Sequence, residues 1–146
     1  MAERRQLLQS FAAFAGLSLA SNCRFGGTLQ AATNDDRFMK RAFEMKQAAT
    51  GSGDQPYGAV IVKDGDVIGE GPSRVIANQD PTAHAEMEAI RDAARKLGTR
   101  SLEGCIIYAT SRPCRMCETA AYWANISYIY YGDALNDGGR PDYSSC

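Results

Sequence analysis

Histidine is scarce in this sequence, and its scarcity limits how the chain can hold a metal. The 146 residues include one histidine, His84, and one tryptophan, Trp123. The five cysteines are an odd number without a regular framework, which argues against a scaffold stapled by disulfides. Any metal site built from imidazole and thiolate groups therefore has a single imidazole, and its other ligands must be cysteines.

The sequence also lacks an excess of positive or negative charge, and it has no extended apolar segment. Sixteen basic and 17 acidic residues give a formal net charge of -1, so no whole-molecule basic field is available to grip nucleic acid. No internal repeat occurs, and no apolar run is long enough to predict a membrane span. A hydrophobic share of 45% and a charged share of 23% are typical of a globular protein with one sizeable core.

The first thirty residues have the features of an export signal. Arg4 and Arg5 precede two leucines and an uncharged apolar stretch, residues 11–20, as in a twin-arginine signal. Small residues favour cleavage after Ala20, whereas lipidation of Cys23 is less favoured because Asn22 precedes it. We therefore expect residues 1–32 to be a signal and linker, residues 33–146 to be the folded domain, and the protein to be periplasmic. The alternative is an N-terminal amphipathic helix in a cytoplasmic protein.

Hydrophobic periodicity and turn residues divide the remaining chain into alternating helices and strands. Helices are expected at 35–49, from Pro81 to Gly98 with Asp80 as N-cap, and at 113–125. Strands are expected at 59–62, 67–70, 105–109 and 126–131, the first two joined as a hairpin across Asp64-Gly65. Residues 132–146 are expected to be irregular. This order predicts an α/β fold, a three-layer α/β/α sandwich with a mixed sheet of four to five strands.

The chemistry is concentrated in two short segments, His84-Ala85-Glu86 and Pro113-Cys114-Arg115-Met116-Cys117. Zinc prefers imidazole and thiolate ligands in a tetrahedral set, and His84, Cys114 and Cys117 supply three. The open fourth position is typical of catalytic zinc rather than structural zinc. Both segments lie at expected helix starts, where unpaired amides and the helix dipole stabilise thiolates.

Glu86 is the predicted proton carrier. Zinc with two thiolates and a neutral imidazole is formally neutral, and a neighbouring carboxylate can accept a proton from water and deliver it to a leaving group. A closed structural zinc site would need Cys23, Cys105 or Cys146 as fourth ligand. Cys105 lies in an apolar run and is expected to be buried in the core.

His-x-Glu followed by Pro-Cys-x-x-Cys resembles the signature of zinc nucleobase deaminases. From Pro56 through Tyr131 the chain resembles the cytidine deaminase-like superfamily. Residues 56–62, 80–86 and 122–124 look most like bacterial guanine deaminases and, next, tRNA adenosine deaminases. The resemblance implies hydrolytic deamination of a nucleobase or nucleoside with Zn²⁺, release of ammonia, and a homodimer.

The same resemblance implies residues that contact the base. Tyr57 and Trp123 are expected to wall the pocket, where flat rings gain from stacking on a purine. Ser73 takes the place of an asparagine that reads the base in relatives. Asp137 or Asp142, in the glycine-rich tail, is expected to replace an acidic residue that relatives use for the same purpose. The alternative for each aromatic is ordinary core packing.

Two arginines depart from the resemblance. Arg112 stands where a glutamate usually precedes the proline, and Arg115 replaces an apolar or proline residue. Their positive charge would favour a substrate with a carboxylate or phosphate, or would lie on a solvated helix end.

Three functions remain open at this stage. Deamination of a free base or nucleoside, guanine-type first, is favoured, with cytosine or cytidine as further candidates. A tRNA adenosine deaminase is less favoured because of the acidic balance and the export signal. A zinc-binding interaction module without catalysis is least favoured, because Glu86 would have no purpose there.

Overall fold

The computed structural model describes residues 36–132 and 137–141. The predicted signal and linker, residues 1–32, lie outside this part of the chain. Three helices and five strands follow one another in the order α1 (Asp36–Gly51), β1 (Gly58–Lys63), β2 (Asp66–Pro72), α2 (Ala85–Leu97), β3 (Ile106–Ala109), α3 (Arg115–Trp123), β4 (Tyr128–Tyr131) and β5 (Asp137–Gly139).

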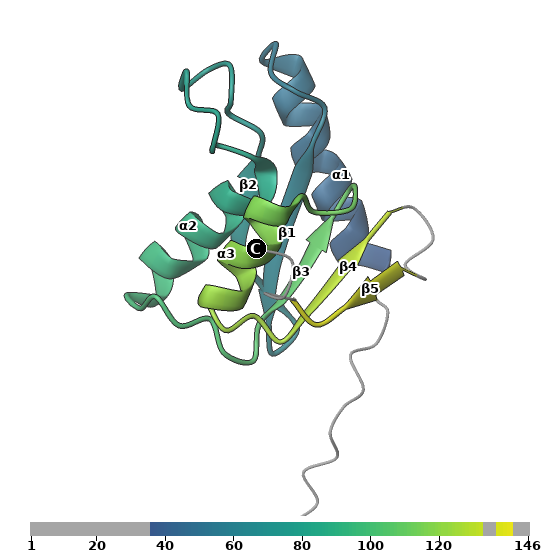
Figure 1. Cartoon of the computed structure of the whole chain (residues 1–146). Helices are drawn as coiled ribbons and strands as arrows, with labels where there is room; N and C mark the ends of the chain where they lie inside the picture. The colour runs from purple at the N-terminus through teal and green to yellow at the C-terminus, as the bar shows by residue number, and fades with distance from the viewer. Residues whose placement is uncertain (1–35, 133–136, 142–146) are drawn as a thin grey trace, which may run out of the picture. The chain divides into compact units, whose positions relative to one another are not determined.

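The strands form one mixed sheet in the order β2-β1-β3-β4-β5. β3 and β4 are parallel and are joined through α3, whereas the other neighbouring pairs are antiparallel. The β1–β2 hairpin turns at Asp64 and Gly65, both with positive φ, as the Asp-Gly pair predicts. Figure 1 shows α2 and α3 on one side of the sheet and α1 on the other. The predicted three-layer α/β/α sandwich is therefore confirmed.

The two faces of the sheet have separate cores, because neighbouring residues of a strand point to opposite faces. Ala59 and Ile61 of β1 pack with α2 and α3, and Val60 and Val62 pack with α1. The core under α2 and α3 is rich in alanine, whereas the core under α1 contains Phe38, Met39, Met45 and Tyr108. Cys105 is fully buried in the first core, as its apolar neighbours predict.

Glycines of β2 allow α2 to lie very close to the sheet. A Cβ atom on Gly69 would come within 2.5 Å of the Ala89 carbonyl oxygen. A Cβ on Gly71 would overlap the Ala85 carbonyl oxygen at the start of α2. No larger residue fits at either position unless the helix moves, so these glycines fix where the first turn of α2 lies.

The structure corrects two helix starts, shortens the strands expected at 105–109 and 126–131 to Ile106–Ala109 and Tyr128–Tyr131, and adds a strand in the tail. The helix expected from Pro81 begins at Ala85, because the Asp80 carboxylate accepts hydrogen bonds from the backbone N–H and hydroxyl of Thr82 and forms a separate turn. The helix expected from Pro113 begins at Arg115. The tail expected to be irregular contains β5, whose backbone pairs with β4.

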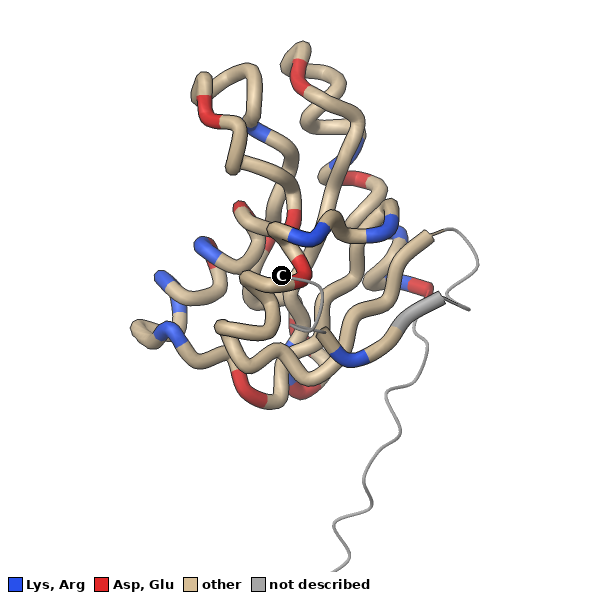
Figure 2. Tube along the Cα trace, in the orientation of Figure 1, with Lys and Arg blue, Asp and Glu red and all other residues tan. Residues whose placement is uncertain are grey.

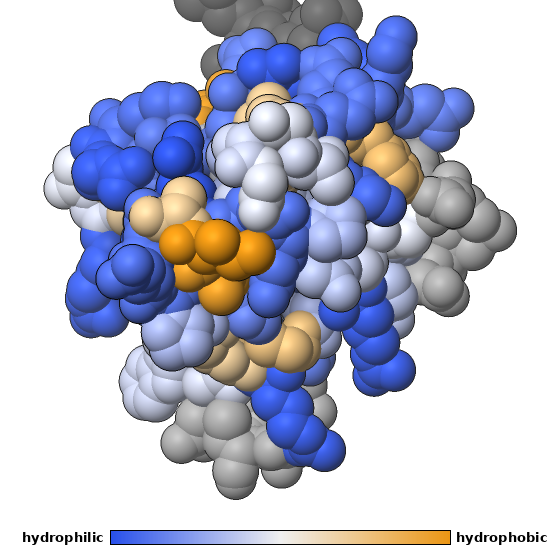
Figure 3. Space-filling view, turned by 90° about the horizontal axis from the view of Figure 1, so that it is seen from above, coloured by the Kyte–Doolittle hydropathy of each residue, from blue (hydrophilic) through white to orange (hydrophobic). Residues whose placement is uncertain are grey.

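The surface carries both signs of charge and little continuous apolar area. Basic and acidic residues are interspersed along the chain (Figure 2), which agrees with the absence of a single basic face. Seen from above, the surface is mostly hydrophilic with scattered apolar side chains (Figure 3). Within residues 36–132 and 137–141, none of the helices has the length and apolar character of a membrane span.

Candidate metal centre and active site

His84 lies immediately before α2 rather than inside it. It is the N-cap residue, with an extended backbone (φ −64°, ψ 156°), and its carbonyl oxygen accepts the first hydrogen bond of the helix, from the N–H of Glu88. Because His84 is outside the helix and Glu86 is in its first turn, a spacing of two residues does not send the two side chains to opposite sides. The glycines of β2 hold this end of α2 against the sheet.

Cys114 and Cys117 occupy the corresponding end of α3. Cys114 is the N-cap residue, also extended (φ −73°, ψ 168°), and its carbonyl oxygen accepts from the N–H of Glu118. Cys117 lies in the first turn and is 1% exposed. The two helix starts therefore present the three predicted ligands from the same kind of position, and neither N-cap residue makes a side-chain capping bond.

The three ligand atoms form a nearly equilateral triangle. His84 Nδ1 lies 3.6 Å from Cys114 Sγ and 3.6 Å from Cys117 Sγ, and the two sulfurs are 3.7 Å apart. Zn–S and Zn–N bonds of about 2.3 and 2.05 Å at tetrahedral angles would place sulfur and nitrogen about 3.6 Å apart, and two sulfurs about 3.8 Å apart. The donor set and its dimensions fit a zinc ion. Among the described residues, this is the one group of three or more His, Cys, Asp or Glu side chains with metal-site spacing.

Glu86 is buried beside this triangle. It is 6% exposed, and burial raises the pKa of its carboxyl group, although its own backbone N–H, a hydrogen bond from Cys117 and the charge of His84 act in the opposite direction. A buried carboxyl group with a raised pKa holds a proton more tightly than a free one, which suits a group that accepts and returns a proton.

The buried thiol of Cys117 shows why the centre needs a cation. Burial raises its pKa strongly, and the neighbouring Glu86 carboxylate and Cys114 thiol raise it further. An ionised sulfur in this setting is stable only when a positive charge compensates it, and metal binding displaces such protons. A metal that binds Cys117 would therefore have to displace the proton of its thiol.

A cavity of about 700 Å³ opens over the centre. His84, Glu86 and Cys114 line it, together with residues before β1 and after β3: Gln55, Pro56, Tyr57, Ser111 and Arg112. The cavity is large enough for a nucleobase or nucleoside.

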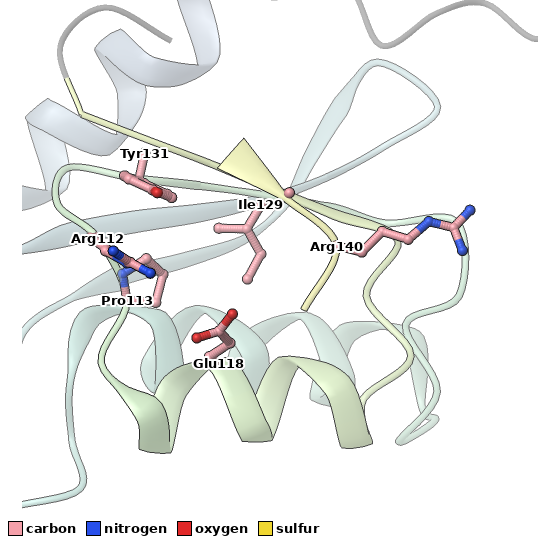
Figure 4. Close-up of a pocket in the computed structure, with 7 residues that line it drawn as sticks. Arg112, Pro113, Glu118, Ile129, Tyr131 and Arg140 are labelled. Carbon is pink, nitrogen blue, oxygen red and sulfur yellow. The ribbon is translucent and has the colours of Figure 1, made fainter. Parts of the chain in front are cut away.

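A second cavity, of about 190 Å³, lies between α3 and strands β4 and β5 (Figure 4). Arg112 lines both cavities. In Figure 4 the Glu118 carboxylate projects into the smaller cavity, whereas the Arg140 guanidinium points away from it. The smaller cavity contains no residue of the triangle.

The predicted substrate contacts have different positions. Tyr57 lines the site cavity and is 43% exposed. Trp123 is 59% exposed at the end of α3, packs edge-on against Tyr122, and does not line that cavity. Ser73 is 1% exposed, and its hydroxyl donates to Asp54. The backbone of Asp137 belongs to β5, and Asp142 lies outside the described residues, as do Cys23 and Cys146.

Asp54 is a structural residue of the site that the sequence did not reveal. Its carboxylate is 6% exposed and accepts four hydrogen bonds, from the backbone N–H groups of Gln55, Ile76 and Ala77 and from the Ser73 hydroxyl. Burial alone would raise the pKa of Asp54, but these bonds outweigh it and lower the pKa. In the sequence Asp54 lies in a Gly-Ser-Gly-Asp stretch that indicates only the end of a helix.

Known proteins of similar sequence include a guanine deaminase and several tRNA-specific adenosine deaminases. The chain is 41% identical to guanine deaminase of Bacillus subtilis (strain 168) over 111 residues, 75% of this chain and 71% of that protein. It is 43% identical to the tRNA-specific adenosine deaminase of Aquifex aeolicus (strain VF5) over 94 residues, 64% of this chain and 62% of that protein.

Solved structures of similar fold and sequence include proteins of the same two kinds. The Bacillus subtilis guanine deaminase structure aligns with a TM-score of 0.64 and 45% identity over 66% of this chain, which spans 62% of that chain's length. A structure from a study of A-to-I editing by tRNA:A34 deaminases aligns with a TM-score of 0.66 and 40% identity, over 67% of this chain and 71% of that one. Residues 32–133 match the family described as the cytidine and deoxycytidylate deaminase zinc-binding region, and the chain belongs to this family.

Proposed function

We propose that this protein is a zinc-dependent hydrolytic deaminase of a nucleobase or nucleoside, with a guanine-type base as the favoured substrate. The observation that carries the proposal is the triangle of His84 Nδ1, Cys114 Sγ and Cys117 Sγ beside the buried Glu86, with His84, Cys114 and Glu86 lining an open cavity. A site that only held a metal would need neither the buried carboxylate nor access from solvent.

The proposed chemistry divides between the metal and the chain. When bound, zinc supplies Lewis-acid activation of water near neutral pH. Glu86 accepts the proton that this water gives up and delivers it to the amino group that leaves as ammonia. The cavity walls hold the ring so that its amino-bearing carbon faces Glu86 and the metal ligands, with Tyr57 available to stack on the base.

Guanine-type specificity is favoured because residues 56–62, 80–86 and 122–124 look most like bacterial guanine deaminases, and the guanine deaminase of Bacillus subtilis is 41% identical over 75% of this chain. A tRNA adenosine deaminase is the second candidate, because several proteins of that name are also similar. The net charge of -1 and the interspersed surface charges argue against it, since binding an RNA stem relies on basic surface.

A substrate panel tests the proposal. Zinc-loaded full-length protein is offered guanine, guanosine, cytosine, cytidine, adenine and a tRNA anticodon stem, and ammonia release is measured. We expect release from guanine or guanosine, and loss of release after zinc is removed by a chelator. Activity on the anticodon stem alone would favour the second candidate, and zinc binding without activity on any of the six would contradict the proposal.

Two further properties belong to the proposal. The amino-terminal arginine pair and apolar stretch support export through the twin-arginine route, which carries folded metalloproteins. Finding uncleaved protein only in the cytoplasm of the native host would contradict it.

The family resemblance supports a homodimer, which sedimentation of the zinc-loaded protein would test.

A further inference from the structure

The wall of the site cavity contains an amide side chain without an assigned role. Gln55 lines the cavity, is half-buried, and its carboxamide has no hydrogen-bond partner within the part of the chain that the structure describes. A carboxamide offers two N–H donors and a carbonyl acceptor in one plane. Such a group facing an open cavity is available to a ligand.

Ser73, by contrast, is already engaged. Its hydroxyl donates to Asp54 Oδ1 at 2.9 Å, its backbone N–H donates to the Tyr57 carbonyl oxygen at 3.1 Å, and it is 1% exposed. In this conformation it cannot present a polar atom to a molecule in the cavity, so reading of the base falls to another residue.

The backbone of Gln55 is held on both sides. Its N–H donates to Asp54 Oδ1 at 2.8 Å, and its carbonyl oxygen accepts from the N–H of Tyr57 at 2.8 Å. The second oxygen of Asp54 accepts from Ile76 and Ala77, at 3.0 and 2.9 Å, in the loop after β2. The buried carboxylate thus ties the segment that carries Gln55 to a second segment. A side chain on a fixed backbone loses less conformational entropy when it binds.

We propose that Gln55 is the specificity-determining residue that reads the substrate base, and that Asp54 is the positioning residue that holds it. The carboxamide pairs with a ring edge on which a hydrogen-bond donor and an acceptor are adjacent, as on purine bases. Tyr57, two residues away on the same wall, offers an aromatic face to the same ring. This inference rests on the proposed function, because it names how that site recognises its substrate.

The test compares two glutamines. Gln55→Leu removes both hydrogen-bonding groups, and Gln55→Glu keeps the shape and removes the donors. The same changes at Gln47, exposed on α1, are the matched controls. For guanine, we expect both Gln55 variants to raise KM about 10- to 100-fold, with kcat within about threefold of wild type, since a bidentate base contact is worth about 1–3 kcal/mol. The Gln47 variants keep the wild-type KM.

Binding is measured separately from turnover. Zinc-loaded Glu86→Gln protein is titrated with guanine by calorimetry, with and without Gln55→Leu, and we expect the second change to weaken Kd by the same 10- to 100-fold. Asp54→Asn is expected to raise KM in the same direction while zinc content stays at one per chain. If guanine is not turned over and another base of the panel is, that base is used in both measurements.

The outcomes separate the two proposals. A wild-type protein that turns over none of the panel contradicts the proposed function. An active wild-type protein whose Gln55 variants keep KM and Kd within twofold, or lose kcat at unchanged KM, overturns the assignment of Gln55 and leaves the deaminase proposal intact. Circular dichroism and zinc content of each variant show whether a loss comes from misfolding.

Discussion

The two faces of the sheet are built differently. On the face covered by α2 and α3, small residues dominate: Ala85, Ala89 and Ala93 of α2 lie against Gly69 and Gly71 of β2. On the face covered by α1, the core is made of large side chains, with Phe38 and Tyr108 in ring contact at 5.2 Å. One described glycine, Gly58 of β1, also lies close to α1: a Cβ atom there would overlap the Ala42 carbonyl oxygen.

The difference follows from what each face must hold in place. A metal centre that draws ligands from the starts of two helices needs those starts fixed to within tenths of an ångström. Backbone packed against backbone through glycine and alanine has little freedom to shift. Large, flexible side chains such as Met39 and Met45 fill space without fixing the helix as tightly. Both faces thus contain a close backbone approach, at Gly58 under α1 and at Gly69 and Gly71 under α2, and the α2–α3 face is the one whose helix starts carry the candidate ligands.

The largest expected effect comes from one proton carrier on the α2–α3 face. Glu86→Gln is expected to lower kcat by about 10³-fold or more while zinc stays bound, because general acid–base catalysis contributes roughly 10²–10⁴-fold and the amide also leaves a buried acceptor changed. Glu118→Gln, one turn along α3 from Cys114 and outside the site cavity, is the control and should retain activity. Ammonia release and metal content are the measurements. Full activity of Glu86→Gln would remove this residue from its role.

The close packing of α2 is tested by one methyl group. Gly71→Ala places a Cβ on the Ala85 carbonyl oxygen, and we expect a loss of about 3 kcal/mol in the free energy of unfolding. Zinc affinity should fall as well, since the start of α2 has to move. Gly51→Ala, where a Cβ meets nothing within 4 Å, should be neutral or slightly stabilising. Urea unfolding and zinc titration of the two variants decide whether the contrast exists.

A change of side-chain shape on the opposite face should have a smaller effect. Met45→Leu conserves volume in the core under α1, and we expect a loss of less than about 1.5 kcal/mol in unfolding free energy. The kcat and zinc affinity should stay at the wild-type values. A decrease in activity as large as that of Gly71→Ala, at equal stability, would mean that both faces position the site.

The smallest expected effect is electrostatic. Burial would raise the pKa of Asp92, but hydrogen bonds from Lys96 and the backbone N–H of Glu70 and the charge of Arg95 lower it overall. A lowered pKa stabilises the fold above the unfolded value of about 3.9, and this contribution is lost as the pH falls through the folded pKa. Asp92→Asn should therefore cost about 1 kcal/mol or less at pH 7, and the cost should shrink as the pH falls from 4 toward 2. Melting temperatures across this pH range give the measurement, and an equal cost at pH 7 and pH 2 would contradict it.

Most of the fold followed from local sequence signals. The alternation of β-branched runs with helical periodicity predicted the layers, and Asp64-Gly65 predicted the hairpin. Residues 137–139 carry no local strand signal, because Asp-Gly-Gly is a sequence typical of turns. The strand forms there because its backbone pairs with β4, which the local sequence does not predict. The start of α2 was misplaced because Asp80 and Pro81 satisfy the rules for a helix start equally well as for the turn that they form.

Part of the candidate site could likewise be predicted from the sequence, and part could not. The spacing of His84, Glu86, Cys114 and Cys117 indicated the centre, because metal ligands have few alternatives among the residue types. Asp54 and Gln55 gave no such signal, since a carboxylate that holds two loops together is indistinguishable in sequence from a surface turn residue. Their importance depends on contacts with residues 73–77, about twenty positions further along the chain.

The two uncapped helix starts have a consequence beyond chemistry. His84 and Cys114 are N-cap residues, a position where serine or aspartate is common. Neither side chain makes a capping hydrogen bond to the backbone amides of the first helical turn. An ion bound by these ligands would join the first turns of α2 and α3, in addition to the packing of α2 on Gly71. Removing the ion should let both helix starts fray, and the amide hydrogens of Glu88 and Glu118, which make the first hydrogen bonds of the two helices, should exchange with deuterated solvent faster than in the zinc-loaded protein.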